Sequence, residues 1–307
     1  MSESEPEIRP QPDLLPEFKV EANRPGFAAT LAWSAGLLFT LFLIVLFVSF
    51  SFGHVAFESH TPDELYPRVV EGRADVKRMA VAEWAQQAAL DSNLGPNSSQ
   101  TESLIKILST AGENRSSGDD SYYGGIAAVL GFSKAPDLAA QGLYEFLKAT
   151  QPGDLADVQI YALLSIARLK VLVPEGALLD RALSPDVSIR KTTAFILGQR
   201  ALLDQGKTES LMLSLHKLME DSSEAVRWNA TLALARLRDN SGIAGLNHLL
   251  SEALAAKTLT SANLDLYRQV ILVAVEIGDS QAMDRVKKIS QEHPNLQLRQ
   301  SAKELIK

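Results

Sequence analysis

The stretch EAVRWNATLALARLRD, at residues 224–239, decides the fold of this chain. Its apolar residues Val226, Ala230, Ala233 and Leu237 recur at three- and four-residue spacing, which places them on one face of an α-helix. This face is rich in alanine, and small side chains let packed helices approach closely. The stretch therefore predicts an amphipathic helix that packs against other helices.

Six other stretches of the chain resemble this one. The positions equivalent to Arg227 are Lys77, Tyr123, Gln159, Arg190, Arg268 and Arg299. Successive positions lie 31 to 46 residues apart, which is the length of a repeat made of two helices. No run alternates as a β-strand would. We expect an all-α fold, an α-solenoid of about six to seven helix pairs over residues 62–307. In the long first step, we expect one short helix at residues 103–111 between two loops.

The repeated pattern is an acidic residue, an apolar residue, an arginine and then an apolar helix that ends in Gly or Asp. It resembles the HEAT-repeat group, and most closely the short bacterial type found in phycobilisome-lyase-like HEAT proteins. The resemblance covers about residues 62–307 and is strongest over residues 185–239. It implies a solenoid used mainly as a protein-binding surface. It also implies that the repeat arginine often pairs with an acid of the same or the next repeat.

Two interpretations of the repeat arginines stay open. In the first, they are structural and form an internal ladder of ion pairs. In the second, they and the residues after them lie along the inner side of the solenoid and bind a partner. The candidate protein-binding residues are Arg190, Lys191, Arg227, Trp228, Arg268, Gln269 and Arg299. Trp228 is the strongest candidate anchor, because Trp and Arg are enriched in binding hot spots. Burial of Trp228 between repeats is an equal alternative.

A charge-free run, FAATLAWSAGLLFTLFLIVLFVSFSF, occupies residues 27–52. As a helix it would be about 39 Å long, and the hydrocarbon core of a bilayer is about 30 Å thick. We expect an uncleaved signal-anchor, with one transmembrane helix at residues 26–52 and a linker at residues 53–61. A cleaved signal peptide is the rival interpretation, but its apolar core usually has only about 7–15 residues.

Basic residues around this run predict its orientation. Arg9, Lys19 and Arg24 precede the run, whereas Arg68 alone follows it out to residue 71. Loops with an excess of Lys and Arg stay in the cytoplasm. We therefore expect an inner (plasma) membrane protein with a cytoplasmic N-terminus. Its C-terminal domain would be periplasmic, or more generally extracytoplasmic.

The N-terminal tail, residues 1–25, is rich in proline, which disfavours a helix. We expect a disordered tail. The alternative is a linear docking motif formed by the neighbouring apolar residues Leu14, Leu15 and Phe18.

The sequence contains no pattern typical of catalysis or metal binding. It has no cysteine, which excludes disulfides and thiolate metal sites on this chain. No two of its five histidines have the spacing of a zinc-protease helix, and neither a G-x-S-x-G elbow nor a phosphate-binding P-loop occurs. We expect no catalytic residue, no metal, no cofactor and no enzymatic activity.

These observations predict a membrane-anchored protein-binding scaffold or an accessory subunit of a membrane protein complex. The expected partners are other membrane or periplasmic proteins, together with the lipid bilayer through residues 26–52. The formal charge of −7 disfavours a nucleic-acid partner. A ligand-binding sensor is the first alternative. A lyase-like, cofactor-handling enzyme, which the family resemblance implies, is a weaker one.

Overall fold

A computed structural model describes residues 60–111, 119–204 and 209–306 of the chain. The expected tail, the expected transmembrane helix at 26–52 and most of the linker lie outside these residues, as do Leu14, Leu15 and Phe18. Among the described helices, none combines the length and the apolar character that a membrane crossing requires. Residues from His60 to Lys307 form one compact unit.

The described residues contain α-helices and no strand, so the all-α prediction is confirmed for this part of the chain. The helices form seven successive pairs. The first helices of the pairs are α2 (Pro62–Glu71), α4 (Ser98–Ser109), α6 (Pro136–Ala149), α8 (Gly176–Arg181), α10 (Glu209–Leu218), α12 (Asn240–Ala255) and α14 (Ser280–Glu292). A short 3₁₀ turn, η1 (Ser92–Leu94), precedes α4.

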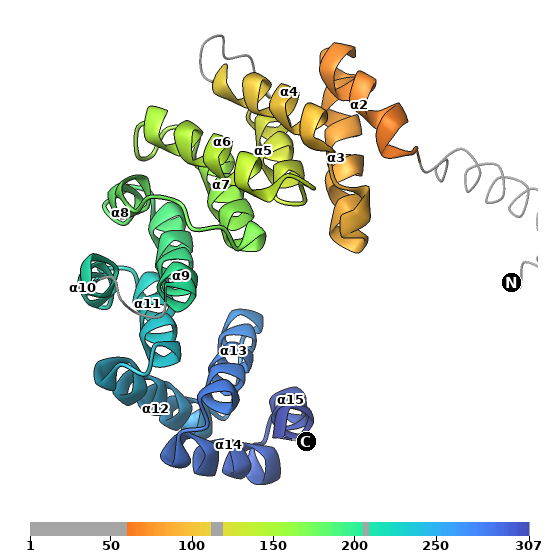
Figure 1. Cartoon of the computed structure of the whole chain (residues 1–307). Helices are drawn as coiled ribbons and strands as arrows, with labels where there is room; N and C mark the ends of the chain where they lie inside the picture. The colour runs from red at the N-terminus through yellow and green to blue at the C-terminus, as the bar shows by residue number, and fades with distance from the viewer. Residues whose placement is uncertain (1–59, 112–118, 205–208, 307) are drawn as a thin grey trace, which may run out of the picture. The chain divides into compact units, whose positions relative to one another are not determined.

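The second helices carry the repeated sequence pattern. They are α3 (Ala74–Leu90), α5 (Asp119–Leu130), α7 (Ala156–Leu169), α9 (Val187–Leu203), α11 (Glu224–Arg236), α13 (Ser261–Ile277) and α15 (Leu296–Ile306). Each of the seven contains one of the positions equivalent to Arg227. Each second helix packs against its own first helix and against the next second helix, and Figure 1 shows the pairs following one another in chain order. The repeat read from the sequence is therefore a structural repeat.

Polar caps fix where several helices begin. The side chain of Asp186 accepts a hydrogen bond from the backbone nitrogen of Ile189 at 3.0 Å at the start of α9, and Asp279 caps α14 in the same way. These caps satisfy amide groups that have no partner inside the helix. At α4, Asn97 and Gln100 form a reciprocal capping box. The expected short helix at 103–111 is therefore wrong in its start, because this box begins the helix at Ser98.

The core divides into two clusters of buried side chains that meet at α11. Leu234 belongs to the cluster that extends back to α2, whereas Leu232 and Ala235 belong to the cluster that extends on to α15. The helices α9 and α11 approach very closely. A Cβ atom added at Gly198 would lie 2.5 Å from the Cβ atom of Ala233. The alanine-rich face of residues 224–239 thus allows the close helix packing that it predicted.

Candidate protein-binding groove

A hollow of about 550 Å³ lies across the second helices α7, α9, α11 and α13. Both apolar and polar side chains line it. The lining residues are Ile160, Leu164, Lys191, Thr192, Phe195, Gly198, Gln199, Asn229, Leu232, Ala233, Arg236, Gln269 and Leu272. On α9 these residues recur every three or four positions, so one face of the helix borders the hollow.

A second hollow of about 520 Å³ lies across α3, α5 and α7 and shares Ile160 with the first. Its lining residues are Ala82, Ala85, Asp120, Ser121, Gly125, Ala128, Asp157, Ile160 and Tyr161. Because both hollows are lined by second helices and meet at Ile160, we refer to them together as the inner groove. It extends over six consecutive second helices, from α3 to α13.

Small residues line both hollows of the inner groove. Gly198 and Ala233 line the first hollow beside the larger Phe195 and Leu232, and Gly125 lines the second. A Cβ atom added at Gly125 would lie 2.6 Å from the Cγ1 atom of Val81 on α3. The groove therefore follows from the close approach of small residues on adjacent helices.

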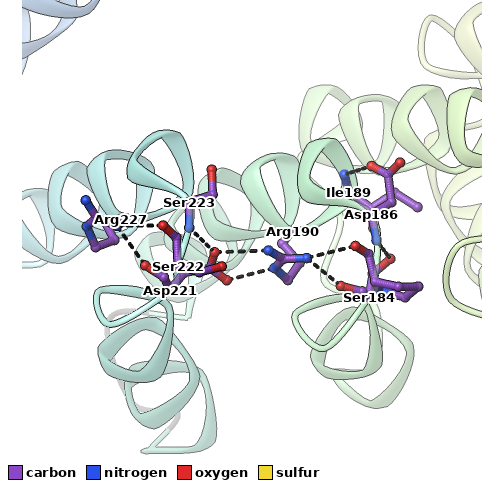
Figure 2. A network of polar contacts seen from close by, with 9 residues as sticks. Ser184, Asp186, Ile189, Arg190, Asp221, Ser222, Ser223 and Arg227 are labelled. Carbon is purple, nitrogen blue, oxygen red and sulfur yellow. Dashed lines mark hydrogen bonds and ion pairs between the residues drawn. The ribbon is translucent and has the colours of Figure 1, made fainter.

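Arg190 is held by a network of polar contacts between two repeats (Figure 2). Its Nε and Nη2 atoms donate to the two carboxylate oxygens of Asp221 at 2.7 and 3.0 Å. Its Nη1 atom donates to the backbone carbonyls of Ser184 and Pro185 at 2.8 and 3.1 Å. The Arg190 and Asp221 side chains are only 14% and 10% exposed. Arg190 therefore joins the loop before α9 to the loop before α11.

The contact with Arg190 also changes the acidity of Asp221. Hydrogen bonds from the Arg190 guanidinium hold the pKa of Asp221 below its ordinary value, and the backbone nitrogen of Ser223 contributes to the same effect. Burial acts in the opposite direction and is outweighed. The same pair raises the pKa of Arg190. Both groups are thus charged at neutral pH, and the ion pair is bidentate.

Two other repeat arginines bind the loop in front of their own helix. Arg227 donates through Nη1 to the carbonyls of Asp221 and Ser222 at 2.9 and 3.0 Å (Figure 2). Arg299 donates to the carbonyl of His293 at 3.2 Å. In each case the acceptor lies five or six residues before the arginine, as for Arg190. We call Arg190, Asp221 and Arg227 the arginine ladder.

Arg268 departs from this pattern. Helix α13 begins at Ser261, so the carbonyl six residues before Arg268 lies inside the helix and is not in a loop. Arg268 is exposed and donates instead to the Ser301 hydroxyl at 3.1 Å, with Asp265 at 3.6 Å as its ion-pair partner. An earlier helix start therefore changes the partner of the arginine.

In one repeat Gln159 stands at the position of the repeat arginine, and an arginine from another helix donates to it and to a loop carbonyl. Arg181, on α8, is 1% exposed and donates through Nε to the Gln159 side-chain oxygen at 2.8 Å. Its Nη2 atom donates to the carbonyls of Leu147 and Thr150. Gln159 in turn donates to the carbonyl of Asp154. Sequence reasoning did not select Arg181, because it lies on a first helix, outside the repeated pattern.

The inner groove brings together only two of the candidate binding residues. Lys191 and Gln269 line it, from α9 and α13. Arg190, Arg227 and Arg299 are engaged with loop carbonyls, outside the lining. Their contacts are those of the structural interpretation.

Trp228 is partly buried and packs against the core cluster that continues to α15. It is not among the lining residues of either hollow. The aromatic residues that do line the inner groove are Phe195 and Tyr161, and Tyr161 is 46% exposed. Of these two, Phe195 could have been identified from its spacing in the sequence. Phe195 follows Lys191 by four residues, one helical turn, on the same face of α9.

The inner groove is lined by apolar side chains together with amide, amine, guanidinium and carboxylate groups. Over residues 60–111, 119–204 and 209–306, no group of three His, Asp or Glu side chains is placed to hold a metal ion. Arg236 at its edge is paired with Glu276 of α13, with 2.8 Å between Nε and Oε2.

Comparisons with known proteins found similar solved structures only. No family model matches it, and no curated protein matches it. Among solved structures it is similar to the Escherichia coli protein YibA. That likeness has a TM-score of 0.46 and 14% identity, and covers 80% of this chain and 92% of that one. It is also similar to human deoxyhypusine hydroxylase, with a TM-score of 0.32 and 13% identity, over 83% of this chain and 98% of that one.

Proposed function

We propose that this chain is a membrane-anchored scaffold or accessory subunit that binds other membrane or extracytoplasmic proteins through the inner groove. The observation that carries the proposal is the groove itself. It is an open, apolar surface that extends over six consecutive second helices, and protein partners bury such surfaces. The HEAT-like sequence pattern supports the same use. The mixture of apolar and polar side chains along the groove supports a binding role.

The anchoring part of the proposal rests on the sequence. The charge-free run at 27–52 supports a membrane helix, and the basic residues before it support a cytoplasmic N-terminus. Tethering would confine the groove to the membrane surface and raise its effective concentration for partners there. A scaffold with this arrangement would collect proteins of the same membrane.

The test is purification of the full-length chain in mild detergent, with mass spectrometry of the co-purifying proteins. A double variant, Tyr161→Arg with Leu272→Arg, places two large cations in the groove at positions that are 46% and 37% exposed. We expect it to lose most of the bound partner. The matched control, Leu183→Arg with Leu213→Arg, changes residues 79% and 57% exposed outside the groove and should retain the partner.

Equal recovery of partners by both double variants would contradict binding through the groove. A partnerless monomer would favour the second candidate, a ligand-binding sensor. That candidate has its own observation, because 550 Å³ lies within the range of about 300–1,000 Å³ found for small-molecule sites. A metabolite that raises the melting temperature of the unmodified chain, and not that of the groove variant, would establish it.

A further inference from the structure

The two halves of the inner groove carry opposite charges. Asp120 on α5 and Asp157 on α7 line the hollow across α3, α5 and α7, whose lining contains no basic residue. Lys191 on α9 and Arg236 on α11 line the other hollow, whose lining contains no acidic residue. The charge therefore changes sign along the groove, between α7 and α9.

Within the part of the chain that the structure describes, three of these four charged groups make no ion pair. Arg236 is paired with Glu276 at 2.8 Å, so little of its charge is left for a partner. Among the described residues, neither Asp120, Asp157 nor Lys191 makes an ion pair. The two carboxylates lie in the first turns of α5 and α7, where the helix dipole favours them. Lys191 lies one turn after the start of α9, where the helix dipole does not favour a positive charge.

Apolar and aromatic side chains line both halves of the groove together with these charges. Ile160 joins the two hollows, Phe195 lies in the basic half, and the exposed Tyr161 lies in the acidic half. A partner would remove the apolar surface from water and would at the same time meet a negative end and a positive end. Complementary charges at both ends fix the register of a bound segment more strongly than they raise its affinity.

We infer that the inner groove receives a bipolar segment of the partner protein, and this inference rests on the proposed function. The segment has apolar side chains along one side, a basic residue over Asp120 and Asp157, and an acidic residue over Lys191. Neighbouring packed helices lie about 8–10 Å apart, so the two steps from α5 to α9, which carry these charges, span about 16–20 Å. A helical segment of about 11–13 residues has this length, and an 18-residue peptide covers it with a few residues to spare.

The probe is a random library of 18-residue peptides, selected against the full-length chain in mild detergent and counter-selected against the Tyr161→Arg, Leu272→Arg variant. We expect the selected peptides to have an apolar stripe, with basic residues concentrated at one end and acidic residues at the other. Lys191→Glu should weaken binding of such a peptide about three- to fivefold, which is the worth of one exposed ion pair. A peptide with its acidic residue changed to Lys should recover binding to that variant.

Two matched variants complete the design. Asp157→Lys should weaken the same peptide by a similar factor, and changing the basic residue of the peptide to Glu should restore binding. Lys288→Glu, at an exposed position on α14 outside the groove, should leave binding unchanged.

The outcomes separate this inference from the proposed function. Peptides that need an open groove but show no charge segregation, or that ignore both charge variants, would overturn the inference and leave the proposed function standing. A selection in which no peptide survives the counter-selection against the groove-blocked variant would overturn both.

Discussion

At the scale of single residues, the arginine ladder shows how one sequence pattern serves the fold. Arg190 and Arg227 bind loop carbonyls five and six residues behind them, and Asp221 joins the two. The Arg190 side chain thus holds the loop of its own repeat and also binds Asp221 of the next repeat. This geometry requires a loop immediately before the second helix, which is why Arg268, far inside α13, does not share it.

The ladder predicts a specific dependence of stability on pH. Because the pKa of Asp221 is lower in the folded chain than its ordinary value, the ion pair stabilises the fold above that ordinary value. This contribution is lost as the pH falls through the lowered pKa, below about pH 4. We expect Asp221→Asn to reduce the free energy of unfolding by about 2 kcal/mol at pH 7 and by less at pH 3. Urea unfolding at pH 7, 5 and 3 measures this difference.

The control for this prediction is Asp265→Asn. Asp265 also faces an arginine, Arg268, but at 3.6 Å and with 73% of its side chain exposed. Exposed pairs contribute about 0–1 kcal/mol, so this variant should unfold like the wild type at every pH. A constant difference between Asp221→Asn and wild type from pH 7 to pH 3 would show that the charge of Asp221 is not what stabilises the fold.

Residue-scale roles were only partly predictable from the sequence. The pattern offered the ladder as one of two interpretations, and the contacts of Arg190 and Arg227 match that one. The partner of Arg190 could be narrowed to an acid of the same or the next repeat, but Asp221 could not be selected from its neighbours. Arg181 could not be found at all, because its role depends on a packing contact with Gln159 between different helices.

At the scale of elements, the second helices were predictable because each repeats the same apolar spacing. The first helices were less so, since they share no pattern with one another. Helix α8 has only six residues, and α4 begins inside a stretch of polar residues that resembles a loop. In α4 the capping box between Asn97 and Gln100 decided the helix start, against the composition of the segment.

Close packing of α9 against α11 predicts the behaviour of Gly198. In an isolated helix, Gly198→Ala would stabilise by about 1 kcal/mol. Here the new Cβ would lie 2.5 Å from that of Ala233, so the helices must separate. We expect net destabilisation of about 1–3 kcal/mol, seen as a lower melting temperature.

Two further variants test the cause of this loss. Adding Ala233→Gly should restore much of the stability of Gly198→Ala, because it removes the opposing atom. Gly176→Ala, where the nearest atom is the Tyr144 hydroxyl at 3.8 Å, should be close to neutral. If Gly198→Ala melts at or above the wild-type temperature, the two helices are not as tightly packed as described.

At the scale of the whole molecule, the placement of the chain across a membrane can be tested directly, because the sequence has no cysteine. Single cysteines at Ser4→Cys and Lys288→Cys would mark the tail and the helical domain. With intact cells and a membrane-impermeant maleimide, we expect labelling at position 288 and none at position 4 until the membrane is opened. Labelling of both, or of position 4 alone, would contradict the proposed orientation.

For the whole molecule, the sequence predicted more of the fold than of the function. Seven copies of one pattern specify a stack of helix pairs, because each pair can bury its apolar face only against its neighbours. The inner groove was not predictable in detail, since it depends on how small residues of adjacent helices meet, as Gly198 and Ala233 do. The sequence offered Lys191, Trp228 and Gln269 as candidates for the inner side; Lys191 and Gln269 line the groove, and Trp228 does not.

The meeting of two core clusters at α11 has a consequence for how the domain moves. The buried residues of α12 to α15 share a cluster with one face of α11, while those of α2 to α10 belong to the other cluster. The last two helix pairs can therefore open and close as a cooperative unit while the earlier pairs keep their core covered. Amide protons on the two sides of α11 would then exchange with solvent at different rates. A partner seated across α9, α11 and α13 would bridge the two units and slow the faster one.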